Sequence, residues 1–146
     1  MKLYLLITLL IITSCGYDEV RCYDTDLEVK LDNFTEEEKD SIILQRYAGT
    51  DFATKTDSFL LAKAGNEISG RGTNSFTLTF LKLGITYQFS DIQYAGKKTE
   101  RRQKVFDLGG SYRPEPCFNN VATVTLDGKK IFFDTKRTSS VTLERK

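Results

Sequence analysis

The densest group of side chains able to do acid–base chemistry is a run of carboxylates, Glu36, Glu37, Glu38 and Asp40. Two carboxylates about 5 Å apart, or about 7–9 Å apart with a water between them, can hydrolyse a glycosidic bond. The chain has no His, so the commonest general base is missing. A turn exposed to solvent is the alternative explanation for these four carboxylates, in place of a catalytic cleft. We therefore keep a carboxylate-dependent hydrolase as an alternative and expect that the protein is not an enzyme.

Metal and cofactor chemistry has no recognisable ligand set in the sequence. Asp24 and Asp26 could bind calcium, but no segment has the spacing of an EF-hand loop. Zinc is not expected, because His is absent and only three Cys are present. No P-loop, GxGxxG or GxSxG motif occurs. We expect no metal and no cofactor.

The first 15 residues, MKLYLLITLLIITSC, have the pattern of a secretory signal. Lys2 provides a positive charge, and the apolar run from Leu3 to Ile12 is shorter than the roughly 20 residues that cross a membrane. Ile12-Thr13-Ser14-Cys15 resembles the bacterial lipoprotein signal, in which an aliphatic residue and two small residues precede an obligatory Cys. The resemblance implies that Cys15 carries a diacylglycerol and becomes the first residue of the mature protein.

A lipidated Cys15 makes the membrane the first expected partner. Each buried methylene contributes about 0.8 kcal/mol, so two or three acyl chains hold a domain stably on a bilayer. Asp18 and Glu19 follow closely, and acidic residues there look like the surface-export signal of Bacteroidota lipoproteins. No Lys or Gln precedes this pair, so surface display and attachment facing the periplasm both stay open. We expect a lipid-anchored protein of the outer membrane.

The two other cysteines, Cys22 and Cys117, allow only one pairing. Export places them in an oxidising compartment, where disulfides persist. Neither belongs to a CxxC motif, and no His is present to activate a thiol. The sequence therefore predicts a Cys22–Cys117 disulfide, with two free thiols as the alternative.

Candidate binding residues gather around the segment 96–104. They are the basic residues Lys97, Lys98, Arg101 and Arg102 and, near expected loop ends, the aromatic residues Tyr94 and Tyr112. The basic group could meet a phosphate, an acidic glycan or an acidic protein, and the rings could stack on a sugar. A solvated hairpin, or charges paired across strands, is the alternative. Nucleic acid is not expected, because the net charge is only +1 and the basic group has no interleaved aromatics.

The elements that must position these residues are short β-strands. Alternating apolar and polar residues predict strands over 26–32, 41–47, 58–63, 75–81, 85–90, 105–108, 121–126, 129–133 and 140–143. Thr35 and Glu38 predict a capping box on one helical turn. Asp127-Gly128 lies between two strand patterns and predicts a tight hairpin.

Many short strands without a long helix predict an all-β fold. We expect an antiparallel β-sandwich of immunoglobulin-like or Greek-key type, with a small β-barrel as the alternative. A length of 146 residues fits one domain. The expected organisation is a signal peptide over 1–14, the lipidated Cys and a tether over 15–25, and the sandwich over 26–146.

The whole layout resembles the small uncharacterised lipoproteins common in Bacteroidota. The shared features are the lipoprotein signal, an acidic tether, a TEEE turn before IILQRY and a final LDGKKI hairpin. The resemblance implies location and fold rather than an activity. We expect a non-catalytic role in binding or scaffolding another envelope protein or a glycan. A surface glycan-binding accessory protein, using Tyr94, Tyr112 and the basic residues, is the alternative.

Overall fold

The computed structural model describes residues 17–62, 64, 65, 67–69, 74–103 and 116–145. These residues form twelve β-strands and a single helical turn, so the fold is all-β as predicted. No helix in this described part is long and apolar enough to cross a membrane. The chain divides into two compact units, Met1–Tyr23 with Lys97–Phe118, and Asp24–Gly96 with Asn119–Lys146, and each is described by itself.

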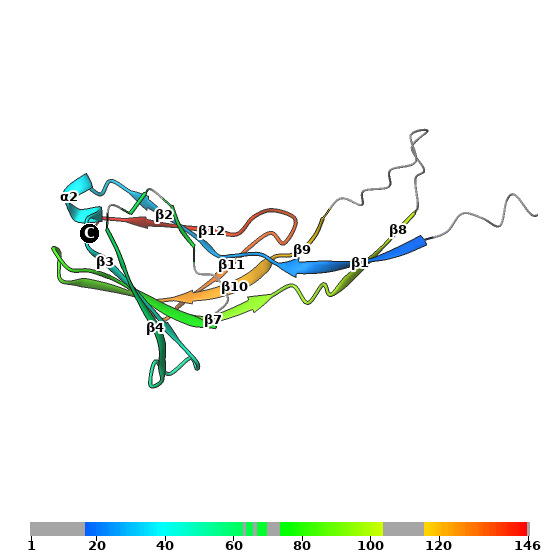
Figure 1. Cartoon of the computed structure of the whole chain (residues 1–146), viewed down its shortest axis with the longest axis horizontal. Helices are drawn as coiled ribbons and strands as arrows, with labels where there is room; N and C mark the ends of the chain where they lie inside the picture. The colour runs from blue at the N-terminus through cyan, green and yellow to red at the C-terminus, as the bar shows by residue number, and fades with distance from the viewer. Residues whose placement is uncertain (1–16, 63, 66, 70–73, 104–115, 146) are drawn as a thin grey trace, which may run out of the picture. The chain divides into compact units, whose positions relative to one another are not determined.

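The larger unit contains a six-stranded antiparallel sheet (Figure 1). Its strands, in spatial order, are β11 (Lys129–Phe132), β10 (Val121–Leu126), β7 (Ile85–Tyr94), β6 (Ser75–Phe80), β3 (Ile42–Tyr47) and β4 (Lys55–Leu61). β11 and β4 are the two edges and do not pair with each other within the described residues. The sheet is therefore open, and the alternative of a small closed barrel is wrong.

A three-stranded sheet of the same unit faces the larger one and completes a β-sandwich. Its strands, in spatial order, are β12 (Ser140–Glu144), β2 (Glu28–Asp32) and β5 (Glu67–Ser69). β5 is antiparallel to β2, but β12 runs parallel to β2. The antiparallel pattern that we predicted has this one exception, because a strand alternates in the same way whatever its direction. The long connection that a parallel pair needs is provided by the six-stranded sheet, which lies between β2 and β12 in the chain.

The core fills the space between these two sheets. Its buried members include Phe76, Leu78 and Phe80 from β6, Val29 and Leu31 from β2, and Val141 and Leu143 from β12. These are the apolar positions of the predicted alternation. The rings of Phe76 and Phe89 stack with their centroids 4.4 Å apart, so the strongest strand patterns also carry the centre of the core.

β7 is longer than the predicted strand 85–90, because a bulge carries it on to Tyr94. Phe89 is buried before the bulge and Ile92 after it, so the alternation shifts by one residue. Asp91 lies at the shift with a φ of 49°, and the pairing with β10 changes register there. The bulge brings Tyr94 to a half-buried position at the margin of the core.

The predicted tight turn joins β10 and β11. Leu126 pairs with Lys129, and the two residues between them, Asp127 and Gly128, have φ values of 47° and 81°. Both central residues therefore have positive φ, as a type I′ turn requires.

Replacing Gly128 by Ala is expected to lower the free energy of unfolding by about 1–2 kcal/mol, because a Cβ is strained at positive φ. Nothing lies within 4 Å of the added Cβ, so backbone strain alone causes the loss. Chemical denaturation measures it. The matched control is Gly65→Ala, where a Cβ also has open space but φ is not positive. Equal losses in the two variants would contradict the assignment.

Helix α2 (Glu36–Lys39) is the single turn that the sequence predicts, and it carries the predicted capping box. The Thr35 N–H donates to Glu38 Oε2 at 2.9 Å, and the Glu38 N–H donates to Thr35 Oγ1 at 3.3 Å. The Arg145 guanidinium lies 2.7 Å from Glu38 Oε1. The hydrogen bond from the Thr35 backbone is the main reason that the pKa of Glu38 is lowered, and it outweighs the effect of desolvation.

Replacing Glu38 by Gln is expected to flatten the acid dependence of stability. Because the pKa of Glu38 is below 4.5 in the folded state, the ionised carboxylate stabilises the fold above pH 4.5, and this stabilisation is lost as the pH falls through the folded value. Thermal unfolding between pH 7 and pH 2 measures the dependence. The exposed neighbour Glu37, replaced by Gln, is the control and should leave the slope unchanged. Identical slopes for the wild type and Glu38→Gln would refute this role.

The smaller unit contains a three-stranded sheet in the order β8 (Thr99–Gln103), β1 (Tyr17–Asp24) and β9 (Cys117–Asn119), of which Asp24 and Asn119 belong to the larger unit. The segment 15–25, expected as the lipidated Cys and a tether, includes Tyr17–Asp24, which form β1. No alternation of apolar and polar residues in the sequence indicates this strand, because charged residues occupy many of its positions. The strand predicted over 105–108 lies outside the described residues.

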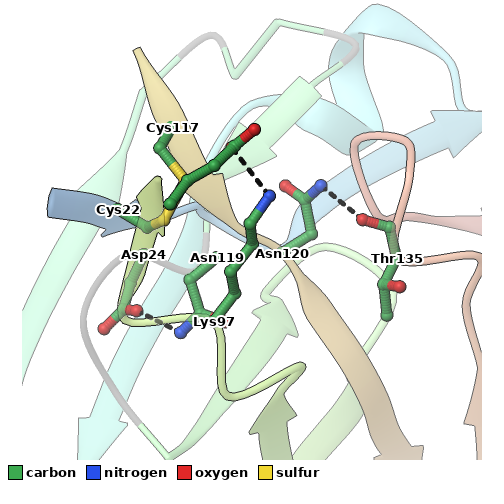
Figure 2. The surroundings of a disulfide bond; sticks show 8 residues. Cys22, Asp24, Lys97, Cys117, Asn119, Asn120 and Thr135 are labelled. Atoms are coloured by element: carbon green, nitrogen blue, oxygen red, sulfur yellow. Dashed lines mark hydrogen bonds and ion pairs between the residues drawn. A yellow bond between two sulfur atoms is a disulfide. The ribbon is translucent and has the colours of Figure 1, made fainter. Parts of the chain in front are cut away.

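The predicted disulfide is present and joins β1 to β9 (Figure 2). Cys22 and Cys117 are both buried, and their Cα atoms are 4.3 Å apart. The Cys22 N–H donates to the carbonyl of Lys98 at 2.9 Å, so the bridged residue is also held by the backbone of the segment before β8. The bond closes a sequence separation of 95 residues.

Candidate functional site

The predicted basic cluster lies on and just before β8, opposite acidic residues of β1. In the antiparallel ladder Arg101 faces Glu19, and Arg102 faces Asp18. The side chains of Asp18 and Arg102 lie outside what the structure describes, which leaves Glu19 and Arg101 as the described pair. Opposite charges placed directly across a ladder attract each other, which favours the alternative of charges paired across strands.

The remaining basic residues of the cluster also have local roles. Lys97 forms an ion pair with Glu100, with 2.8 Å between Nζ and Oε2. The Arg101 guanidinium lies 4.9 Å from the centroid of the Tyr17 ring, a cation–π distance. Lys98 is exposed. The cluster is thus part of a charged sheet edge, and its role in binding stays a prediction.

The two candidate tyrosines do not form a common surface in the described structure. Tyr94 packs against the core at the end of β7, and Tyr112 lies outside the described residues. Burial raises the pKa of Tyr94, and the nearby carboxylates of Asp24 and Asp26 raise it further. The glycan-binding alternative, which needs exposed rings, therefore stays a prediction.

The carboxylate run does not have the electrostatics that the hydrolase alternative predicts. Glu36 and Glu37 are exposed, and Glu38 is buried in its capping box. A general acid needs a raised pKa at neutral pH, whereas the pKa of Glu38 is lowered. The run stabilises a turn, and no step of hydrolysis can be derived from it.

The two aspartates considered for calcium accept hydrogen bonds from protein side chains. The Asn119 amide donates to Asp24 at 2.6 Å, and the Ser69 hydroxyl donates to Asp26 at 2.8 Å (Figure 2 for the first). Among residues 17–145, within the described ranges, no group of three or more His, Cys, Asp or Glu side chains could hold a metal ion.

A groove that the sequence did not predict lies within the larger unit, where an edge of each sheet meets solvent. It runs between β3 and β4 on one side and β5 on the other, and its volume is about 730 Å³. That volume lies within the range of roughly 300–1,000 Å³ typical of ligand sites. Its lining includes Leu44, Arg46, Phe59, Leu61, Ala64 and Ile68. Leu44 and Ile68 are core residues, so the floor of the groove is the margin of the hydrophobic core.

Arg46 is the cation of this groove. It lies on β3 in phase with Ile42 and Leu44, the residues that point into the core. Its guanidinium lies 5.1 Å from the centroid of the Phe59 ring. Its Nε is buried and has no hydrogen-bond partner in the described structure. Leaving a buried donor unpaired costs about 1–3 kcal/mol, so an acceptor that displaced the covering atoms and reached this Nε would recover that cost.

Two apolar side chains of β4 remain exposed. Phe59 and Leu60 are 42% and 64% exposed. Consecutive residues of a strand point to opposite faces, so Phe59 shares the groove-facing phase of Leu61 and the side chain of Leu60 is exposed on the other face of β4. The arrangement can hold an apolar group against Leu44 and Ile68 and an anionic group near Arg46.

The sequence contained two signals for this site, of which the first is the stronger. Ile42, Leu44 and Arg46 occupy alternate positions of one strand, so an Arg replaces an apolar residue in the core-facing phase. The apolar triplet Phe59-Leu60-Leu61 shortly before a glycine-rich segment was a second, weaker hint. That β4 and β5 are sheet edges could not be read from the pattern, because alternation does not reveal strand order.

Comparisons with known proteins add no relative. No family model, no curated protein and no solved structure matches this chain. The class of protein is therefore defined by the fold itself, an all-β sandwich with a disulfide and an open groove.

Proposed function

We propose that the protein is a lipid-anchored component of a bacterial cell envelope, attached to the outer membrane through Cys15, with a non-catalytic role in binding another envelope component. The observation that carries the proposal is the N-terminal sequence. An apolar run from Leu3 to Ile12 ends in Ile12-Thr13-Ser14-Cys15, the pattern of a lipoprotein signal. Cys15 itself lies outside the described residues.

The disulfide supports export. Cys22 and Cys117 are bonded, and disulfides are rare in proteins that stay in the reducing cytosol. A chain that carries a signal at its N-terminus and a disulfide in its folded part fits the envelope better than the cytoplasm.

The groove supports the binding role. It has a volume of about 730 Å³, an apolar floor and one unpaired cationic donor, which suits a partner with apolar and anionic groups. The carboxylate run, by contrast, is engaged in a helix cap. The binding role therefore rests on a site of suitable size and chemistry.

Metabolic labelling with an alkyne analogue of palmitate tests the anchoring in a bacterial host. We expect label in the wild type and none in Cys15→Ser. The variant should also keep its signal segment and therefore have a larger mass than the processed wild type. Ser14→Ala is the matched control, because it keeps a small residue before the Cys and should still be labelled. Label that persists in Cys15→Ser, or a wild type without label, would overturn the proposal.

A further inference from the structure

We propose that the groove accepts an extended polypeptide segment of another protein, which pairs with β4 as a seventh strand of the six-stranded sheet. The inference rests on the proposed binding function and specifies the chemistry of the partner. The segment carries an apolar side chain that enters the groove and, within a few residues, a carboxylate that reaches Arg46. This is strand addition at a sheet edge, a mode in which main-chain hydrogen bonds provide affinity and side-chain pockets provide specificity.

Within the described residues, the main chain of β4 has groups without a ladder partner in the right place. The Leu81 N–H donates to the carbonyl of Ser41, which fixes the odd-numbered residues of β3 as those that bond to β6. The even-numbered residues of β3 then bond to β4, where they face Asp57, Phe59 and Leu61. A second hydrogen bond, from the Ala48 N–H to the Thr54 carbonyl, agrees with this, because it joins an even-numbered residue just after β3 to the residue just before β4.

The residues between these, Ser58 and Leu60, therefore direct their N–H and C=O groups toward the open edge. β4 is the last strand of the sheet, and its residues are exposed along most of its length. Leu60 belongs to the stretch of β4 that lines the groove, and Ser58 lies directly before that stretch. A strand added there would satisfy them and cover the groove at the same time.

This stretch also lacks the protection found on two other edges, β8 and β11. Charged side chains normally block edge-to-edge pairing. β8 carries Glu100 and Arg101, and β11 begins with Lys129 and Lys130. In β4 the charges are confined to Lys55 and Asp57, and the run Ser58–Leu61 has none. This uncharged run lies beside the groove.

The side chains of the groove define what the added strand must carry. Phe59 and Leu61 share the core-facing side of β4, so residues placed opposite them point into the groove. An apolar side chain there meets Leu61 and Ile68, and a carboxylate can accept from the unpaired Nε of Arg46. An acyl chain with an anionic head would use the groove but leave the main-chain groups of Ser58 and Leu60 unpaired, so an extended peptide uses more of what the site offers.

Selection from a phage-displayed random nonapeptide library tests the proposal. The full-length chain is immobilised in mild detergent through a C-terminal affinity tag, with the bare tag surface as counter-selection, so the result does not depend on whether the chain carries an acyl group. We expect enriched peptides with an apolar residue and an Asp or Glu a few positions apart. Ser58→Pro should weaken their binding at least about ten-fold, because it removes an outward N–H, whereas Ser58→Ala keeps the N–H and should bind as the wild type.

A measurement on the peptide side keeps the test valid even if Ser58→Pro does not fold. N-methylation of an enriched peptide, one residue at a time, should abolish binding at alternate residues only, which is the signature of a strand. Arg46→Gln should remove the preference for Asp or Glu. Strand addition would be overturned if N-methylation weakened binding without alternating along the peptide, or if no peptides were enriched. It would also be overturned if dodecanoate or a second copy of the chain bound in place of the peptides. None of these outcomes bears on the acyl labelling of Cys15, so the two proposals fail separately.

Discussion

Replacing both Cys22 and Cys117 by Ala is expected to lower the free energy of unfolding by up to about 4–5 kcal/mol. The bond closes a separation of 95 residues, and a long loop restricts the unfolded chain more than a short one does. The loop contains residues 24–96, most of the larger unit, so the effect should reach the unfolding of the sandwich. Urea denaturation of the oxidised wild type and of the double variant measures the difference.

The reduced wild type is the control for this prediction. It should unfold at nearly the same urea concentration as the double variant, because the two differ only by buried thiols. A double variant as stable as the oxidised wild type would contradict a stabilising role for the bond. A double variant much less stable than the reduced wild type would show instead that the two sulfur atoms matter mainly for packing.

Replacing Phe76 by Ala is the second large effect, with an expected loss of about 3–5 kcal/mol. Phe76 on β6 is fully buried, and its ring stacks on that of Phe89 with the centroids 4.4 Å apart. Truncation leaves a cavity between the two sheets that the stiff strands cannot close. The loss is a large part of the total stability of about 5–15 kcal/mol that is usual for a domain, so the variant should melt at a much lower temperature.

Phe132→Ala is the matched control for this truncation. Phe132 is 75% exposed on β11, so its removal should change the unfolding free energy by only about 0.5 kcal/mol. Similar losses for the two variants would mean that the core does not lie between the sheets as described. Thermal unfolding followed by circular dichroism gives both values in one experiment.

The strand pattern of the sandwich could be predicted because one face of each strand is buried. Phe76, Leu78 and Phe80 alternate with polar residues and are all fully buried, and Ser75 and Thr77 on the other face of β6 are buried as well. The capping box and the Asp127-Gly128 turn were predicted for a similar reason, since each depends on neighbours in sequence. The disulfide was predicted by elimination, because only two cysteines remained for pairing.

What could not be predicted depends on contacts between distant segments. β1 is paired with β8 through opposed charges such as Glu19 and Arg101, and no apolar alternation marks it. The parallel pairing of β12 with β2 cannot be read from the sequence of either strand. The groove could not be predicted for the same reason, because it exists only where the edges β4 and β5 come together.

We propose that the groove is the place where the protein meets its partner. Photo-crosslinking in intact cells tests this most directly, with a photoreactive residue placed at Phe59, which lines the groove, and, as control, at Phe132, and both positions are exposed. We predict an adduct with another envelope protein from position 59, lost in the added presence of Ser58→Pro, and no such adduct from position 132. Equal adducts from both positions, or none from position 59, would contradict the proposal.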